Sequence, residues 1–102
     1  AANDINVIRR RAAKTGCEKE MEIRPEDVDI DFILDERGRE LSAEMQRFYD
    51  LKRTGKLVER VKQHNPDAAP NIKDYHVLRP IPQSVLDAVT NKKEFTQNNG
   101  YN

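Results

Sequence analysis

Three glutamates, Glu36, Glu40 and Glu44, repeat every four residues in the middle of the chain. In an α-helix, side chains four residues apart lie on nearly one face, about 6 Å from one another. Paired carboxylic acids at such a spacing are what a glycoside hydrolase needs, one as the acid and one as the base or nucleophile. Catalytic carboxylates usually face each other across a cleft from different elements, however, so three along one helix face are more typical of ion pairing.

Basic side chains surround these glutamates at helical spacing. The expected i,i+3 and i,i+4 pairs are Arg37 with Glu40, Arg47 with Glu44 and Asp50, Arg53 with Asp50, and Arg39 with Asp35. An apolar stripe shares its side of the helix with Arg37, and arginine suits bidentate, partly buried pairing with a carboxylate. We therefore predict a partly buried structural ion-pair network, with no catalytic role, made of Glu36, Arg37, Glu40, Glu44, Arg47 and Asp50.

The remaining reactive residue types form no recognisable site. Cys17 is the sole cysteine, so it cannot form a disulfide within the chain, and no histidine near it in the sequence would activate its thiol. His64 and His76 are the two histidines, and neither stands at a spacing typical of metal ligands. We predict no catalytic residue, no metal site and no cofactor.

A run of three arginines, residues 9–11, is the strongest basic cluster. The formal net charge of the chain is zero, and neither a sustained basic stripe nor a nucleic-acid fold signature accompanies the run. We expect an ion-paired or solvated face and no nucleic-acid partner. Rings of Phe48, Tyr49 and Tyr75 are of the type that stacks on sugars, but the helical spacing of Phe48 favours a place in the core.

The elements that must position these residues are predicted to be helices. Apolar periodicity and helix-breaking residues give helices over approximately 4–14, 25–41, 43–54, 56–64 and 82–89. The predicted fold class is mainly α, with about four to five helices and an irregular, turn-rich extended C-terminal tail. The stretch 75–82 is expected to be extended because residues before proline disfavour helix.

Helix ends are predicted from capping residues. Asn3 or Asp4 is expected to cap the first helix and Gly16 to end it. Ser42 would cap a third helix, although one bent helix through this point is an alternative. Gly55 is expected to end that helix in a left-handed conformation. Asn99-Gly100 is the strongest turn signal of the tail.

The composition predicts a thin hydrophobic core. Charged residues make up 35% of the chain, and 23 of the 102 residues are Leu, Ile, Val or Phe. A typical globular domain has about 25% charged residues. No apolar run approaches the roughly 20 residues of a membrane span. We expect a single folded piece of a larger protein, marginally stable by itself, that does not span a membrane.

Five short motifs occur in order along the chain. They are Asn-x-x-Arg-x-Arg-Ala at 6–12, Glu-Arg-x-x-Glu-Leu at 36–41, Glu-x-x-Arg-x-x-Asp-Leu at 44–51, Pro-Ile-Pro at 80–82 and Gln-Asn-x-Gly-Tyr at 97–101. Together they resemble the C-terminal region of SusD/RagB-type outer-membrane nutrient-binding lipoproteins of Bacteroidetes. The chain departs from this pattern at Met45 and Gln46, where the family often has Gly and then an aromatic residue or His, and at Asn99, where it often has Pro.

The resemblance implies a longer protein of which residues 1–102 are a C-terminal domain fragment. Such proteins are mostly helical, carry tetratricopeptide-like helix pairs in their N-terminal part, and are surface-exposed on the outer membrane through a lipidated N-terminal cysteine. They sit on a TonB-dependent SusC-like transporter and bind glycans or other nutrients without catalysing a reaction. Cys17 is internal and is not the lipidated residue, and ligand-binding residues are expected outside this fragment.

Two other hypotheses follow from the residues. The chain could be a self-standing helical protein–protein interaction module that docks a partner through the face of Phe48. It could also be a glycosidase fragment that uses Glu36 and Glu40. The interaction module requires an exposed face at Phe48, and the glycosidase requires a cleft at Glu36 and Glu40. A mainly structural part of a nutrient-binding protein requires neither.

Overall fold

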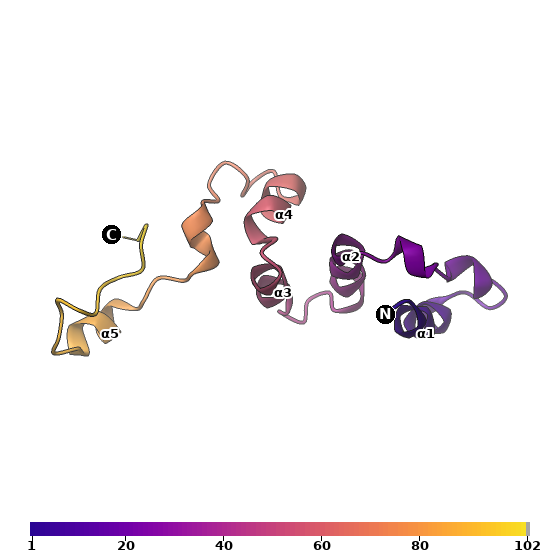
Figure 1. The fold of residues 1–102 in the computed structure, drawn as a ribbon, viewed down its shortest axis with the longest axis horizontal. Helices are drawn as coiled ribbons and strands as arrows, with labels where there is room; N and C mark the ends of the chain where they lie inside the picture. The colour runs from indigo at the N-terminus through magenta and orange to yellow at the C-terminus, as the bar shows by residue number, and fades with distance from the viewer. Residues whose placement is uncertain (102) are drawn as a thin grey trace. The chain divides into compact units, whose positions relative to one another are not determined.

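The regular elements of the computed structural model, which describes residues 1–101, are helical (Figure 1). The α-helices are α1 Ala2–Ala12, α2 Ile30–Glu40, α3 Arg47–Arg53, α4 Leu57–His64 and α5 Gln83–Ala88. Three short 3₁₀ turns complete them: η1 Lys19–Met21, η2 Pro25–Asp27 and η3 Asp74–Val77. Within residues 1–101 there is no strand. The predicted mainly α class with an irregular C-terminal tail is confirmed.

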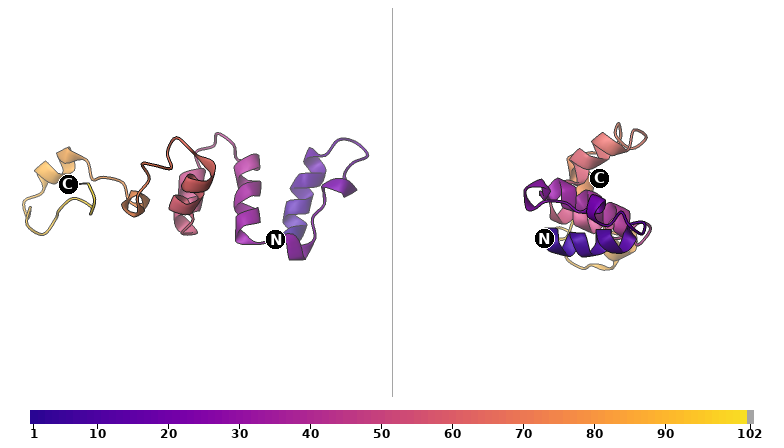
Figure 2. Two further views of the ribbon diagram at one scale, coloured as in Figure 1. Left: turned by 90° about the horizontal axis from the view of Figure 1, so that it is seen from above. Right: turned by 90° about the vertical axis from the view of Figure 1, so that its right-hand side faces the viewer.

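Two compact units make up the chain, and the boundary between them falls within α3. The first comprises Ala1–Asp50 and the second begins at Leu51. In the first unit α1 and α2 lie side by side (Figure 2). The second unit contains α4, η3, α5 and the closing tail. Each unit is described by itself.

Helix α1 begins and ends earlier than the predicted range 4–14. Its N-cap is Ala1, which makes no side-chain capping hydrogen bond, so the predicted caps at Asn3 and Asp4 are wrong. The helix ends because Ala13 is extended, with φ −66° and ψ 151°. Gly16, the predicted terminator, lies beyond the end, in the turn that follows, with φ +89°.

The predicted helix over 25–41 is two separate elements. Pro25–Asp27 forms the 3₁₀ turn η2, and Val28 and Asp29 leave the helical conformation. The Asp29 carboxylate then accepts a hydrogen bond of 2.7 Å from the backbone N–H of Phe32. This N-cap satisfies an otherwise unpaired amide and starts α2 afresh at Ile30.

The turn between α2 and α3 differs from both predictions for this region, the Ser42 cap and the single bent helix. Leu41–Gln46 is not helical, so the single bent helix is wrong, and α3 begins at Arg47 instead of at residue 43. Ser42 therefore caps no helix. Two non-glycine residues of this turn, Ala43 and Met45, have positive φ, +67° and +62°. L-residues pay a steric cost in that region, so the turn carries backbone strain.

Helix boundaries in the second unit follow the prediction more closely. Gly55 ends α3 with φ +70°, as predicted, and the N–H of Lys56 donates to the carbonyl of Leu51 at 2.8 Å. Helices α4 and α5 lie within about one residue of their predicted ranges. The predicted extended stretch 75–82 is helical in its first part, where η3 forms, and extended only from Leu78 to Pro82.

The hydrophobic core is thin. The buried apolar residues within 1–101 are Ala2, Leu34, Leu51 and Leu57, and the buried polar residues are Asn6, Asp50 and Arg60. In the described chain no buried side-chain nitrogen or oxygen lacks a hydrogen-bond partner. Polar contacts therefore carry much of the packing. Among the helices of residues 1–101, none combines the length and the hydropathy that crossing a membrane requires.

Candidate functional site

The Asn6 amide joins α1 to the extended segment around Ile23. Its Nδ2 donates to the Ile23 carbonyl at 3.0 Å, and its Oδ1 accepts from the Ile23 N–H at 2.9 Å. Asn6 is 9% exposed, so both bonds are largely shielded from water. A side-chain amide thus satisfies both backbone groups of one residue, as a neighbouring strand would. The contact positions the loop that follows α1.

Arg9 forms a well shielded ion pair in the first unit. Its Nε and one terminal nitrogen donate to the two oxygens of Glu36, each at 3.1 Å, and the two side chains are 19% and 13% exposed. Another nitrogen of Arg9 donates to the Met21 carbonyl at 3.0 Å. The guanidinium also lies 5.4 Å from the centre of the Phe32 ring, within cation–π range. One side chain therefore holds α2 and the η1 segment against α1.

The other two arginines of the run are also paired. Arg10 donates to Glu22 at 3.1 Å and to the carbonyl of Asn6 at 3.1 Å. Arg11 forms a more exposed salt bridge with Glu40 of α2. All three cations of residues 9–11 are thus engaged within the first unit, as expected for an ion-paired face.

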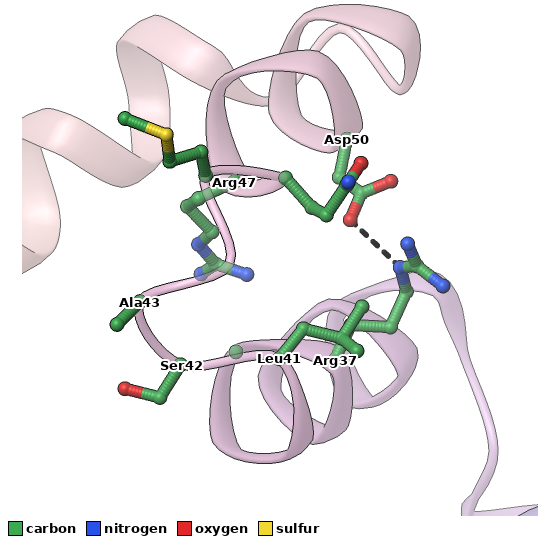
Figure 3. Close-up of a pocket in the computed structure, with 9 residues that line it drawn as sticks. Arg37, Leu41, Ser42, Ala43, Arg47 and Asp50 are labelled. Carbon is green, nitrogen blue, oxygen red and sulfur yellow. Dashed lines mark hydrogen bonds and ion pairs between the residues drawn. The ribbon is translucent and has the colours of Figure 1, made fainter.

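A second contact ties the start of α3 to α2 (Figure 3). Nε of Arg37 donates to the buried carboxylate of Asp50 at 2.7 Å. Arg47 reaches back from α3 and donates to the carbonyl of Leu34. The Arg47 guanidinium rests above Gly38, where an added Cβ would stand 3.4 Å from its terminal nitrogen. An added Cβ at Gly38 would thus make ordinary van der Waals contact with the Arg47 side chain. A cavity of about 520 Å³ opens beside these contacts.

The six predicted network residues have different surroundings. Glu36 and Glu40 pair with arginines of α1, and Arg37 pairs with Asp50, so the expected pair between Arg37 and Glu40 is wrong. Arg47 uses a backbone carbonyl in place of Glu44. Glu44 is exposed in the turn before α3 and has no ion pair within residues 1–101. Arg39 and Glu36, a pair that was not predicted, do follow i,i+3 spacing. A terminal nitrogen of Arg39 lies 2.6 Å from a carboxylate oxygen of Glu36.

The closing motif of the chain clasps the proline-containing segment in the second unit. Gln97 accepts from the Ile81 N–H at 2.7 Å and donates to the Ile81 carbonyl at 2.9 Å. Asn98 donates to the carbonyl of Arg79 at 2.7 Å. Tyr101 donates its hydroxyl to the carbonyl of Leu78 at 2.6 Å. Side chains therefore replace a partner strand for a segment whose two prolines have no N–H to donate.

Gly100 is required by the same clasp. Its φ is +92°, in the left-handed region, and a Cβ at this position would overlap the ring of Tyr75. The Tyr75 ring also meets the Tyr101 ring edge to face, with centroids 5.0 Å apart. The predicted Asn99-Gly100 turn thus serves a close ring-on-backbone contact.

Comparison with known proteins gives these contacts a context. The sequence model of the SusD family matches residues 1–101. The chain belongs to the SusD family. It is 38% identical over 104 residues to the SusD-like protein P25 of Formosa agariphila, a match that covers 95% of this chain and 19% of that protein. This SusD-family chain therefore spans only a small part of that relative's length. No solved structure matches it.

The electrostatics of Glu36 do not suit acid catalysis. Burial alone would raise the pKa of its carboxyl, but hydrogen bonds from Arg9 and then Arg39 outweigh that effect and hold the pKa below its ordinary value. A general acid in glycoside hydrolysis needs a raised pKa. In this SusD-family chain the best placed carboxylate is instead held ionised by two cations.

The other candidate residues stand apart from one another. Cys17 is a half-buried free thiol. His76 accepts a hydrogen bond at its Nδ1 from the N–H of Lys73, at 2.9 Å. The described part of this SusD-family chain contains no cluster of His, Cys, Asp and Glu that could hold a metal ion. Phe48 is half-buried, whereas Tyr49 beside it is 60% exposed.

Residue-by-residue reasoning missed the two amides, Asn6 and Gln97. Both belong to the motifs that carry the family resemblance, and that membership was the available signal. Their roles depend on extended segments 17 and 16 residues away in the sequence. Helical spacing rules describe only neighbours within one turn, so they could not assign these partners.

Proposed function

We propose that this chain is the C-terminal, mainly structural part of a SusD-type nutrient-binding protein. The observation that carries the proposal is the use made of the motif residues. Asn6, Arg47, Gln97 and Tyr101 bind the chain's own backbone, and Arg9 binds both backbone and a carboxylate. Side chains so engaged stabilise a fold and leave little for a ligand.

This proposal includes the absence of enzymatic activity. Glu36 and Glu40, the glycosidase candidates, lie on one helix and are each salt-bridged to an arginine of α1. A retaining or inverting pair instead faces a sugar from two sides, with one member protonated. The lowered pKa of Glu36 supports a structural role for the carboxylate.

For the whole protein, we propose a lipid-anchored, surface-exposed place on the outer membrane and a TonB-dependent SusC-like transporter as partner. The ligand would be a glycan or another nutrient, bound mainly by residues outside this chain. Family membership supports this assignment. Because the match covers 19% of the relative, these are properties of the longer polypeptide and are tested there.

Calorimetric titration of a panel of soluble glycans into the full-length protein and into this chain tests the division of labour. We expect saturable binding by the full-length protein and none by the chain. Equal affinity of the chain for the same glycan would refute the mainly structural role. Failure of every glycan to bind the full-length protein, beside binding of another nutrient class, would correct the ligand alone.

Further measurements test activity, location and the transporter partner. Glycans incubated with the full-length protein should release no new reducing ends. Hydrolysis that is lost in both Glu36→Gln and Glu40→Gln would restore the glycosidase hypothesis.

Metabolic labelling with a fatty acid and co-purification with a TonB-dependent transporter should both be positive. A natural reading frame whose start codon lies near Ala1, without an upstream lipoprotein signal, would favour the self-standing interaction module.

A further inference from the structure

An apolar groove lies between α1 and α2 in the first unit. Its volume is about 320 Å³. The floor is formed by the apolar side chains of Ile5, Ile8, Ile33 and Leu41, and the rim by Ala1, Asp4, Glu36, Arg37 and Glu40. All four floor residues are half-buried. The groove is therefore a continuous apolar strip, flanked by charges and open to solvent.

The ion pairs of the first unit hold this groove open in a fixed geometry. Glu36 and Glu40 stand on α2 at the rim, and both are bound by arginines that extend from α1. The two glutamates are four residues apart on α2 and their two arginines are two residues apart on α1, so the contacts set both the separation and the rotation of the two helices. The groove is thus preformed, which lowers the cost of filling it.

The first unit has few other means of burying apolar surface. Of its residues, only Ala2 and Leu34 are buried apolar side chains. Ridges of side chains on a third helix fit naturally between two neighbouring helices. A groove of this kind takes an amphipathic helix with apolar residues at positions i, i+3 or i+4, and i+7.

We propose that the groove between α1 and α2 holds an amphipathic helix from the part of the same SusD-family polypeptide that lies outside this chain. This inference rests on the proposed function. The relative matched by this chain is far longer than the matched stretch, so the polypeptide has ample length to supply such a helix. Ala1 itself lines the groove.

The charges at the rim define the chemistry of the occupant. Asp4 has a side chain 87% exposed, and Glu40 remains 36% exposed beside Arg11, whereas Arg37, the rim's cation, is paired with Asp50. Asp4 and Glu40 are both acidic and both border the apolar floor. The occupying helix therefore carries lysine or arginine beside its apolar stripe, where these cations meet the rim carboxylates.

Site-specific photo-crosslinking in the full-length protein tests the occupant. A benzophenone amino acid replaces Ile8 in one variant and Leu41 in another, both groove residues on different helices. The matched control places it at Val7, which is on α1 but 62% exposed and outside the groove. Far-ultraviolet circular dichroism establishes whether each variant is folded. If the Ile8 variant does not fold, the Leu41 variant alone carries the test.

Mass spectrometry of the irradiated samples should show crosslinks from both groove positions to one helical segment outside residues 1–102 of the same polypeptide. The control should give at least tenfold less of that product. Crosslinked dimers, equal yields at Val7 and Ile8, or products confined to this chain would each overturn the inference. Glycan titration of the same preparations separates the two proposals. Retained glycan binding with no such crosslink would refute the groove inference alone. The crosslink without any nutrient binding would refute the proposed function alone.

Discussion

Replacing Glu36 by glutamine should destabilise the fold of the first unit through loss of the charge and of one acceptor oxygen. Glutamine has nearly the same shape and keeps one acceptor oxygen. The carboxylate receives three guanidinium hydrogen bonds, two of 3.1 Å from Arg9 and one of 2.6 Å from Arg39. The substitution keeps at most one of the two Arg9 bonds and leaves that cation partly buried without its counter-charge.

The magnitude follows from the burial of the pair. Exposed salt bridges contribute about 0–1 kcal/mol, whereas breaking a buried pair costs about 3–5 kcal/mol. The Arg9 and Glu36 side chains are 19% and 13% exposed, nearer the buried case, but Arg9 keeps its bond to the Met21 carbonyl. We therefore expect Glu36→Gln to lower the free energy of unfolding by roughly 2–3 kcal/mol at pH 7.

The effect should depend on pH in a defined direction. The pKa of Glu36 is lower in the folded chain than its ordinary value, so the unfolded chain binds the proton more readily. The stability that Glu36 contributes is complete above its unfolded pKa, about 4.3, and is lost as the pH falls through the lower folded pKa. The difference between the wild type and Glu36→Gln should accordingly shrink in acid.

Urea titration followed by ellipticity at 222 nm measures the difference, with sucrose added because the thin core leaves little stability to lose. Glu44→Gln is the matched control and should change stability by less than about 0.5 kcal/mol, since Glu44 is exposed in a turn. A double-mutant cycle with Arg9→Gln should give a coupling of about 1–2 kcal/mol. Equal costs at positions 36 and 44, or a cost at position 36 unchanged between neutral and acid pH, would refute the reasoning.

Three further predictions concern backbone strain and the closing clasp. Met45→Gly should stabilise the chain by about 0.5–1 kcal/mol in urea titration, because Met45 has φ +62° and an 88% exposed side chain; a lower urea midpoint would contradict this. Gly100→Ala should lower the free energy of unfolding by more than about 2 kcal/mol, and Gly16→Ala by only about 1 kcal/mol. Both glycines have positive φ, but only the Cβ at position 100 meets the Tyr75 ring. Equal urea midpoints of the two variants would contradict this prediction. Gln97→Glu should speed hydrogen exchange in the Leu78–Pro82 segment, because the carboxylate has no N–H to donate, and unchanged exchange would contradict it.

The existence and type of the helices could be predicted from the sequence. Apolar residues recur at helical spacing around Ile5 and Ile8, Ile30 and Leu34, and Val58, and that local pattern decides which segments are helical. Helix ends were harder to place. Pro25 and Asp29 both resemble helix starts, and the competition between them was decided by the Asp29 carboxylate, which reaches the Phe32 amide.

Partners of the charged residues could not be predicted from spacing. Arg9 and Glu36 are 27 residues apart, and Arg37 and Asp50 are 13 apart. Both pairs depend on how separate helices pack, whereas i,i+3 and i,i+4 rules apply within one helix. Charges on a partly apolar face need neutralising partners wherever they come from, but spacing within one helix cannot say which residues of other helices supply them.

The paired arginine run, residues 9–11, has a consequence for how the gene can vary. Successive residues of a helix point about 100° apart, and the three cations meet three different acids, Glu22, Glu36 and Glu40. Inserting one residue in α1 before this run would turn all three cations away from their partners at once. An insertion in the exposed turn at 14–16 would leave them in register. Length changes should therefore be tolerated after α1 and not within it, a pattern that a library of single-codon insertions would expose directly.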